Sequence, residues 1–232
     1  MPLWRGEKLH VIDAETGKGV WNVSGMYSGG RNGLGAIADG YLVVANSYDN
    51  RIYCFGKGLT ATKVSASPDV SVYGNSVLIK GTVTDQSSGA KDTPAISDED
   101  MSPWMEYLHM QHPKPANAKG VEVTLDTIDP NGNLVHIGDT TSDDSGLFSY
   151  MFTPEVPGKY TIIATFEGSE SYWRSSAETA IGVAEAPQAT PTQIPASQSI
   201  ADMYFIPAIA GLFVLIIIVL ALVLLIILRK RP

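Results

Sequence analysis

The longest apolar stretch of the chain lies near its C-terminal end. From Pro207 to Leu228 no residue is charged or carries a side-chain amide. A helix of this length, at about 1.5 Å per residue, matches the roughly 30 Å thickness of a hydrocarbon core. A buried core helix is the alternative, but an all-round apolar helix of this length has no polar face to show to water. The pattern therefore predicts a transmembrane helix over 204–228.

Basic residues follow this stretch directly, whereas the nearest cation before it is Arg174. They are Arg229, Lys230 and Arg231. Because cations near a membrane span favour the cytoplasmic side, the tail 229–232 is predicted to be cytoplasmic and everything before the helix extracellular. The chain has 16 basic and 24 acidic residues and a net charge of -8. Nucleic acid is not an expected partner, because phosphate binding needs concentrated Lys and Arg.

Short alternating segments dominate the first 58 residues. In LHVIDAETGKGVW (Leu9 to Trp21), apolar positions alternate on either side of ETGKG, and two glycines that tolerate positive φ predict a hairpin turn. Further strands are expected at 35–38, 41–47 and 51–55, with turns at ADG and YDN. From these segments we expect a single antiparallel sheet of the size of a four-stranded propeller blade.

The order of residues in this segment resembles the repeat of PQQ-type (quinoprotein-like) β-propellers. The matching positions are Asp13, Ala14, Thr16, Gly17, Lys18 and Trp21. The resemblance implies that Trp21 closes the gap between neighbouring blades. In that superfamily, PQQ and calcium bind at the propeller axis through residues from several blades, so we expect no cofactor and no catalytic residue for this chain alone. A surface oxidoreductase that is active only with the full propeller is the alternative.

One blade has two apolar faces and cannot cover either by itself. The first thirty residues also contain no apolar segment of the length that an export signal needs. Both features are explained if residues 1–58 are the last blade of a propeller whose earlier blades and signal peptide precede Met1. A ring of blades from several copies of the chain is the rival explanation, and it leaves export unexplained.

Residues 59–184 contain seven strand-like pieces with turns between them, which predicts an antiparallel β-sandwich. Its latter half resembles the immunoglobulin-like (Ig-like) domains of prokaryotic surface proteins. Tyr160 follows Pro-Gly at the start of a strand, where such sandwiches often place a tyrosine that hydrogen-bonds back to the preceding loop. An ordinary strand tyrosine is the alternative.

An insertion at 86–119 separates the second and third strands of the sandwich. Ser102 can cap a helix with Pro103 at its first position. Apolar and polar residues then recur at helical spacing up to Pro113, namely Trp104, Tyr107, Leu108 and Gln111. We expect the apolar stripe of this helix to cover an open face of the sandwich.

Three kinds of site are candidates. His109 and His112, at i and i+3 of the expected helix, could bind copper together with Met105, although methionines on a short helix more often pack. Asn22 begins an N-glycosylation sequon. The segments DPNGN and SDDSG carry carboxylates, but DPNGN lacks the final glutamate of a calcium loop, so we interpret both as turns. The one cysteine, Cys54, is expected to be a small buried side chain.

A stalk rich in Pro, Ala, Thr, Gln and Ser is predicted over 185–203. The order of propeller repeat, Ig-like domain, stalk and terminal helix resembles archaeal membrane-anchored surface proteins. The resemblance implies a tethered cell-surface protein with a binding or structural role, whose partner is an extracellular protein or a glycan. The propeller end would present the interaction surface, and the Ig-like domain would act as a spacer.

Overall fold

The computed structural model describes residues 8–27, 35–187 and 200–230. The chain divides into two compact units, Met1–Ala186 and Pro187–Pro232, which are described separately. The fold is mainly β with one long apolar helix, as the sequence predicts. Most of the expected stalk (188–199), the residue Arg231 and the start of the chain lie outside the described residues.

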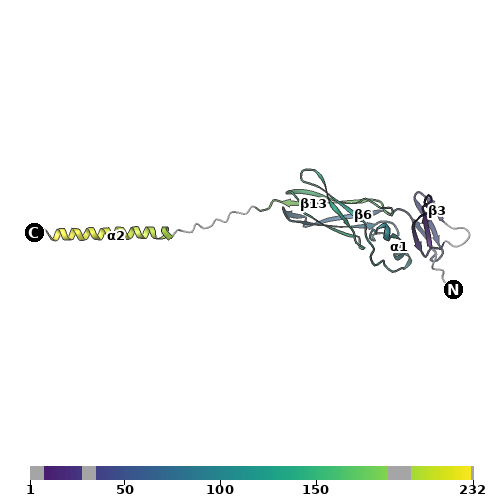
Figure 1. Cartoon of the computed structure of the whole chain (residues 1–232), viewed down its shortest axis with the longest axis horizontal. Coiled ribbons are helices and arrows are strands. Elements are labelled where there is room, and N and C mark those ends of the chain that lie inside the picture. Colours follow the sequence, from purple (N-terminus) through teal and green to yellow (C-terminus); the bar gives the residue numbers. More distant parts are fainter. Residues whose placement is uncertain (1–7, 28–34, 188–199, 231–232) are drawn as a thin grey trace. The chain divides into compact units, whose positions relative to one another are not determined.

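Two facing sheets form the sandwich in the first unit (β6 and β13 in Figure 1). The three-stranded sheet has the order β11 (Leu147–Phe152), β8 (Val77–Asp85), β6 (Thr60–Ser67). The five-stranded sheet has the order β10 (Leu134–Thr141), β9 (Glu122–Ile128), β12 (Gly158–Phe166), β13 (Ser175–Ala184), β7 (Val70–Val72). All pairs are antiparallel except β13 with β7.

This strand order is that of an immunoglobulin fold. Strands β6, β8 and β11 take the places of A, B and E, while β9, β12 and β13 take those of C, F and G. The chain leaves the first sheet after β6 and joins the second as β7. The predicted Ig-like sandwich is therefore confirmed. Strand β7 is not predicted from the sequence, because three residues are too few to show an alternation.

Alternation along the strands builds the core. In β9, the side chains of Val123, Leu125 and Thr127 are buried, whereas the residues between them face outward. The same pattern in β8 and β12 supplies the rest of the core from both sheets. Fully buried members are Val77, Ile79, Val83, Val123, Leu125, Ile162 and Ala164.

Tyr160 closes the corner before β12. Its ring is 3% exposed, its hydroxyl donates to the carbonyl of Val156 at 2.9 Å, and it accepts from the Val156 N–H at 3.0 Å. Both backbone groups of Val156 thus gain a partner from one side chain. The predicted hydrogen bond back to the preceding loop is confirmed.

A buried polar pair sits in the same unit. Asp85, which is 3% exposed, accepts a hydrogen bond from the hydroxyl of Tyr172 at 3.2 Å and another from the Ser87 N–H at 2.7 Å. Burial, together with the negative charge of Asp85, raises the pKa of Tyr172 well above its ordinary value. Tyr172 therefore stays protonated and keeps donating to the carboxylate.

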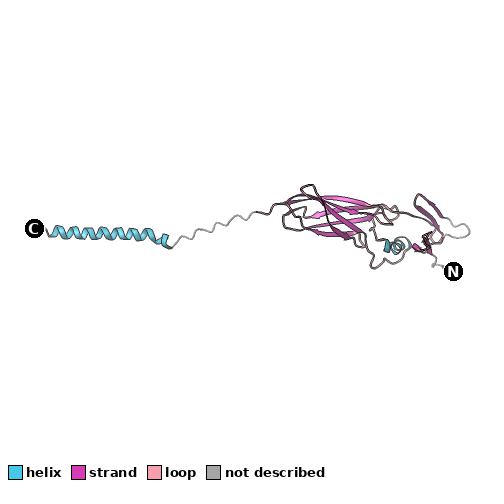
Figure 2. Ribbon diagram, turned by 45° about the horizontal axis from the view of Figure 1, so that its top comes forward, coloured by secondary structure: helices cyan, strands magenta, loops and turns pink. Residues whose placement is uncertain are grey.

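The insertion contains a short 3-10 turn, η1 (Asp98–Asp100), followed by the helix α1 (Met101–Met110), cyan in Figure 2. The helix begins at Met101 with Asp100 as its N-cap, so the expected cap at Ser102 and the expected first helical position of Pro103 are each wrong by two residues. Asp100 holds this start in place, because its carboxylate accepts the Lys119 N–H at 2.9 Å.

The apolar stripe of α1 has its own small core. Trp104 and Leu108 pack with Ile96 and Ala118 of the insertion itself, rather than covering a sandwich face as expected. Met101 is the helix residue that packs against the sandwich core. The insertion is therefore a small folded element with a cluster of its own.

The N-terminal strands form two sheets within the described residues. One is the hairpin of β1 (Lys8–Ile12) and β2 (Gly19–Ser24); the other has the order β3 (Gly35–Ala38), β4 (Tyr41–Asn46), β5 (Arg51–Phe55). The expectation of a single four-stranded sheet is therefore wrong for these residues. The two sheets instead pack through apolar side chains that include Val23, Met26 and Val44, so they stack and do not join at an edge.

The second unit contains the helix α2, Ile200–Arg229. It begins four residues before the expected start of the span and so includes the last residues of the expected stalk. Met203–Arg229 is long and apolar enough to cross a membrane, with a mean hydropathy of 3.7 over its best window and none of that window buried.

Candidate interaction surfaces

The motif Asp-Ala-x-Thr-Gly shapes the turn between β1 and β2. One carboxylate oxygen of Asp13 accepts the N–H groups of Glu15 and Thr16 and the Thr16 hydroxyl, at 3.1, 2.7 and 2.7 Å. These bonds from Thr16 hold the pKa of Asp13 below its ordinary value. Gly17 has a φ of 69°, a conformation that favours glycine. The motif residues Asp13 and Gly17 thus have a local structural role.

Trp21 lies between the two N-terminal sheets. Its ring centroid is 5.0 Å from that of Phe55 on β5, and the rings of Phe55 and Tyr53 stack with their centroids 6.1 Å apart. The side chain packs against the cluster that contains Val23 and Val44. Trp21 therefore joins one sheet to the next. A role for Trp21 between neighbouring propeller blades stays a prediction.

The other face of the β3–β4–β5 sheet is left uncovered by the residues that the structure describes; we call it the outer face. The inner face carries Leu42 and Val44, so by alternation the outer face carries the residues between them and their direct partners. These are Ala36, Ala38, Tyr41, Val43, Ala45, Ile52 and Cys54. None of them is charged, and the exposed fractions are 48% for Tyr41, 36% for Val43 and 76% for Ile52.

Cys54 belongs to this outer face and is exposed, so the expectation of a buried side chain is wrong. The reason lies in the register: Cys54 opposes Val43, whereas the neighbouring Tyr53 and Phe55 point to the inner cluster. In 41–45 and 51–55, apolar residues occupy positions on both faces of the strands instead of every second position. This pattern is the sequence signal that could have identified the outer face.

The far side of the hairpin has a different character. It carries Lys8, His10 and Asn22, and the Lys8 ammonium donates to the Asn22 side-chain carbonyl at 3.2 Å. Ile12 and Val20 are exposed near its turn. The two outward-facing surfaces of the stacked sheets are therefore chemically distinct: that of the hairpin carries polar and charged groups, and the outer face carries no charged residue.

Helix α1 is attached to the N-terminal sheets by a carboxylate. Glu106 accepts hydrogen bonds from the backbone N–H of Ser24, at 2.6 Å, and from its hydroxyl, and it pairs with His112 at 3.2 Å. Burial raises the pKa of Glu106, but the bonds from Ser24 and the nearby His112 and Lys8 outweigh it and lower the pKa. Met110 also packs into the N-terminal cluster.

The copper candidates do not form the expected helical pair. Helix α1 ends at Met110 and Gln111 is left-handed, with a φ of 58°, so His112 lies beyond the helix. His109 meets the Tyr53 ring edge-on at 6.4 Å, and His112 pairs with Glu106. Burial and the charge of Arg51 lower the pKa of His109. Among the described residues, no group of three or more His, Cys, Asp or Glu side chains could hold a metal ion. A role for Met105 stays a prediction.

Both carboxylate loops are turns, as predicted: DPNGN joins the hairpin of β9 and β10, whereas SDDSG leads from β10 to β11 in the other sheet. Asp129 accepts the N–H groups of Asn131 and Asn133 at 2.9 and 2.8 Å, and its pKa is lowered by the bonds from Asn133. Asp143 likewise accepts from Ser145 and Leu147 at 2.8 and 2.9 Å. These carboxylates complete their own turns.

The sequon at Asn22 lies on β2, where Asn22 pairs with His10 across the hairpin. Its third residue, Ser24, is bound to Glu106 through both backbone and hydroxyl. Glycosylation of Asn22 stays a prediction.

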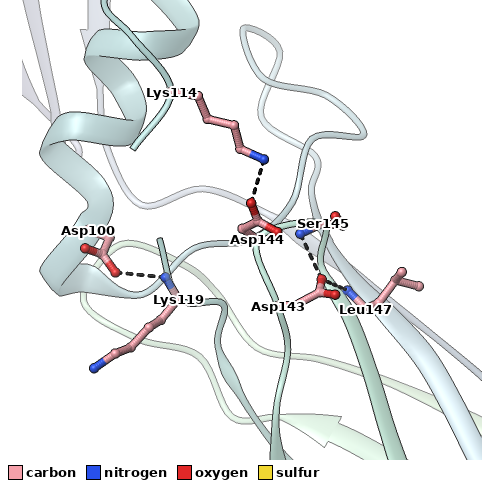
Figure 3. A network of polar contacts seen from close by, with 7 residues as sticks. All are labelled: Asp100, Lys114, Lys119, Asp143, Asp144, Ser145 and Leu147. Carbon is pink, nitrogen blue, oxygen red and sulfur yellow. Dashed lines mark hydrogen bonds and ion pairs between the residues drawn. The ribbon is translucent and has the colours of Figure 1, made fainter. Parts of the chain in front are cut away.

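A second surface, which the sequence analysis missed, lies beside α1. Figure 3 shows Lys114, just after the helix, reaching Asp144 in the turn before β11, with Nζ and Oδ2 2.7 Å apart. This bond raises the pKa of Lys114 and lowers that of Asp144. A cavity of 360 Å³ opens here, between Trp104 and Tyr107 of α1 and the turn at 144–145. The turn at 144–145 is far from α1 in sequence, so no local pattern could have revealed the cavity.

No family model matches the chain, and no curated protein matches its sequence. Among solved structures, the sporulation control protein Spo0M from Bacillus subtilis is 12% identical, with a TM-score of 0.32, over 56% of this chain and 51% of that one. A CARDB domain from Pyrococcus furiosus, solved in complex with di-metal ions, is 13% identical, with a TM-score of 0.28, over 56% of this chain and 90% of that one. This chain thus spans about half the length of Spo0M. Neither likeness assigns an activity to it.

Proposed function

We propose that the chain is a cell-surface protein, tethered by α2, whose N-terminal sheets present an interaction surface on an Ig-like spacer. The observation that carries the tether is α2 itself: Met203–Arg229 has a mean hydropathy of 3.7 and none of its most apolar window is buried. An apolar helix of that length needs a lipid environment, because water solvates it poorly.

Orientation follows from charge. Arg229 and Lys230 lie at the C-terminal end of the helix, and the sequence adds Arg231 outside the described residues. Cations at this end favour a cytoplasmic tail, and this supports our proposal that the Ig-like domain and the N-terminal sheets lie outside the cell.

The outer face is the surface that we assign to binding. A sheet in water normally pairs an apolar face with a polar one, yet β4 and β5 carry apolar side chains on both. The inner face is already covered by another small antiparallel sheet, with Trp21 in between. We therefore propose that the outer face packs against a further antiparallel sheet of the same repeat. The assignment to an archaeal surface protein with a quinoprotein-type propeller end belongs to this proposal and rests on the sequence resemblance.

Cys54 provides a direct test of the covered face, because it is the only cysteine of the chain and lies on that face. Membranes that contain the full-length protein are treated with a maleimide, and its reaction with Cys54 is compared with its reaction at Glu155→Cys, an exposed position of the sandwich. We expect slow labelling of Cys54. Ile52→Lys should make it fast, because a charge on the outer face prevents packing.

Ile12→Lys is the matched control, since Ile12 is also an exposed β-strand isoleucine but lies on the hairpin. It should leave Cys54 slow to react. If Cys54 reacts in the unsubstituted protein as fast as the cysteine at position 155, the outer face is free in the membrane and this assignment is wrong.

A further inference from the structure

The cavity beside α1 joins an aromatic wall to a set of polar groups. Trp104 and Tyr107 form the wall, with ring centroids 5.4 Å apart. The lining also includes Thr93 of the insertion and, from the turn before β11, Asp144 and Ser145. The cavity therefore depends on the insertion, which supplies the aromatic side.

Trp104 has a polar group with no partner. Its side chain is 3% exposed, and its indole Nε1 is buried without a hydrogen-bond partner in the described structure. A buried N–H that makes no bond lowers stability, and native proteins seldom contain one without a reason. A bound molecule that offers an acceptor oxygen would supply the missing bond.

Lys114 covers the tryptophan. Its ammonium lies 5.6 Å from the Trp104 ring centroid and is held by the single bond to Asp144, and both side chains are about two-fifths exposed (42% and 40%). Because exposed ion pairs contribute little, the lysine can turn outward at small cost. Movement of one flexible side chain would therefore enlarge the cavity beside Trp104.

We propose that this cavity binds a neutral pyranose sugar. A pyranose has an apolar C–H face that fits an aromatic side chain and hydroxyls that both donate and accept hydrogen bonds. Asp144 would accept from such hydroxyls, Lys114 and the Trp104 N–H would donate to them, and Thr93 and Ser145 can do either. One positive and one negative group give a charged ligand no net advantage, and an apolar ligand would leave all of these groups unpaired.

This inference adds a second surface to the proposed function and does not depend on it, because the cavity belongs to the insertion and not to the outer face. Binding of a sugar can be observed whether or not Cys54 is protected in the membrane. The two experiments therefore fail separately.

The test is NMR of the full-length protein in lipid nanodiscs, prepared without sugar-based detergents and labelled with ¹⁵N at its four tryptophans. The probes are methyl β-glucopyranoside, methyl β-galactopyranoside and methyl N-acetyl-β-glucosaminide. Trp104→Phe identifies the Trp104 indole signal. At least one probe should shift this signal with saturation in the millimolar range and leave those of Trp21 and Trp173 in place.

Variants localise the site. Tyr107→Ala and Asp144→Asn should each weaken binding about tenfold, because one removes the stacking surface and the other the charged acceptor. Tyr73→Ala, at an exposed tyrosine that follows β7, is the matched control and should bind as the unsubstituted protein does. The proposal is overturned if no sugar moves the Trp104 signal up to its solubility limit. It is equally overturned if acetate, methylammonium or a short neutral peptide moves that signal and the sugars do not.

Discussion

The hydroxyl of Tyr160 offers a sharp test of how the Ig-like spacer is stabilised. Tyr160→Phe removes one oxygen from a residue that is 3% exposed and so leaves the N–H and the carbonyl of Val156 without their bonds at 3.0 and 2.9 Å. Losing a buried hydrogen bond and leaving a partner unpaired costs about 1–3 kcal/mol. Since both groups lie in a surface loop that water can reach in part, we expect about 2 kcal/mol, within that range.

The assay is urea unfolding of the full-length protein in lipid nanodiscs, followed by near-ultraviolet circular dichroism, with the midpoint and slope both fitted. Tyr73→Phe is the matched control, because Tyr73 is 46% exposed, and we expect it to change stability by less than about 0.5 kcal/mol. Equal stabilities for Tyr160→Phe and Tyr73→Phe would refute the reasoning.

Three further substitutions test other contacts. Glu106→Gln should weaken the attachment of α1 to the N-terminal sheets. Because folding lowers the pKa of Glu106 from 4.5, the carboxylate contributes fully to stability above that pH, and this contribution is lost as the pH falls through the lower folded pKa. The difference in unfolding free energy between Glu106→Gln and the unsubstituted protein, measured by urea unfolding at several pH values, should therefore shrink in acid. A difference that stays constant with pH would contradict this. Tyr172→Phe should destabilise the sandwich by about 1–3 kcal/mol, because it removes a donor to the buried carboxylate of Asp85, and an unchanged urea midpoint would argue against it. Trp21→Ala should loosen the packing between the N-terminal sheets and speed amide hydrogen exchange in β4 and β5 but not in β12. If β4 and β5 exchange at the same rate in Trp21→Ala and in the unsubstituted protein, Trp21 does not join the sheets.

The sandwich was predictable because its signals are local. Strands of six to ten residues with period-two alternation, as in β9 and β12, can be recognised from the sequence alone. The Pro-Gly before Tyr160 likewise indicates where β12 begins. The three-residue β7 falls below the length at which alternation can be recognised. The apolar helix α2 needed only composition and length.

The errors arise where the outcome depends on contacts between distant segments. Whether β1–β2 and β3–β4–β5 join at an edge or stack is decided by the packing of Val23 on Val44, which no single segment encodes. Cys54 is expected to be buried because a free cysteine usually is, whereas its register with Val43 puts it on the exposed outer face. Their spacing alone would put His109 and His112 on one helical face, but α1 ends at Met110 and Gln111 is left-handed, so His112 lies outside the helix.

The central claim is that α2 crosses the membrane with the folded domains outside the cell. It is tested most directly by labelling intact cells with a membrane-impermeant maleimide, in a Cys54→Ser background with one new cysteine, at Glu155→Cys or at Lys230→Cys. The account predicts that the cysteine at position 155 reacts in intact cells and that the one at position 230 reacts only after the membrane is permeabilised. Labelling of position 230 in intact cells with protection of position 155 would contradict it.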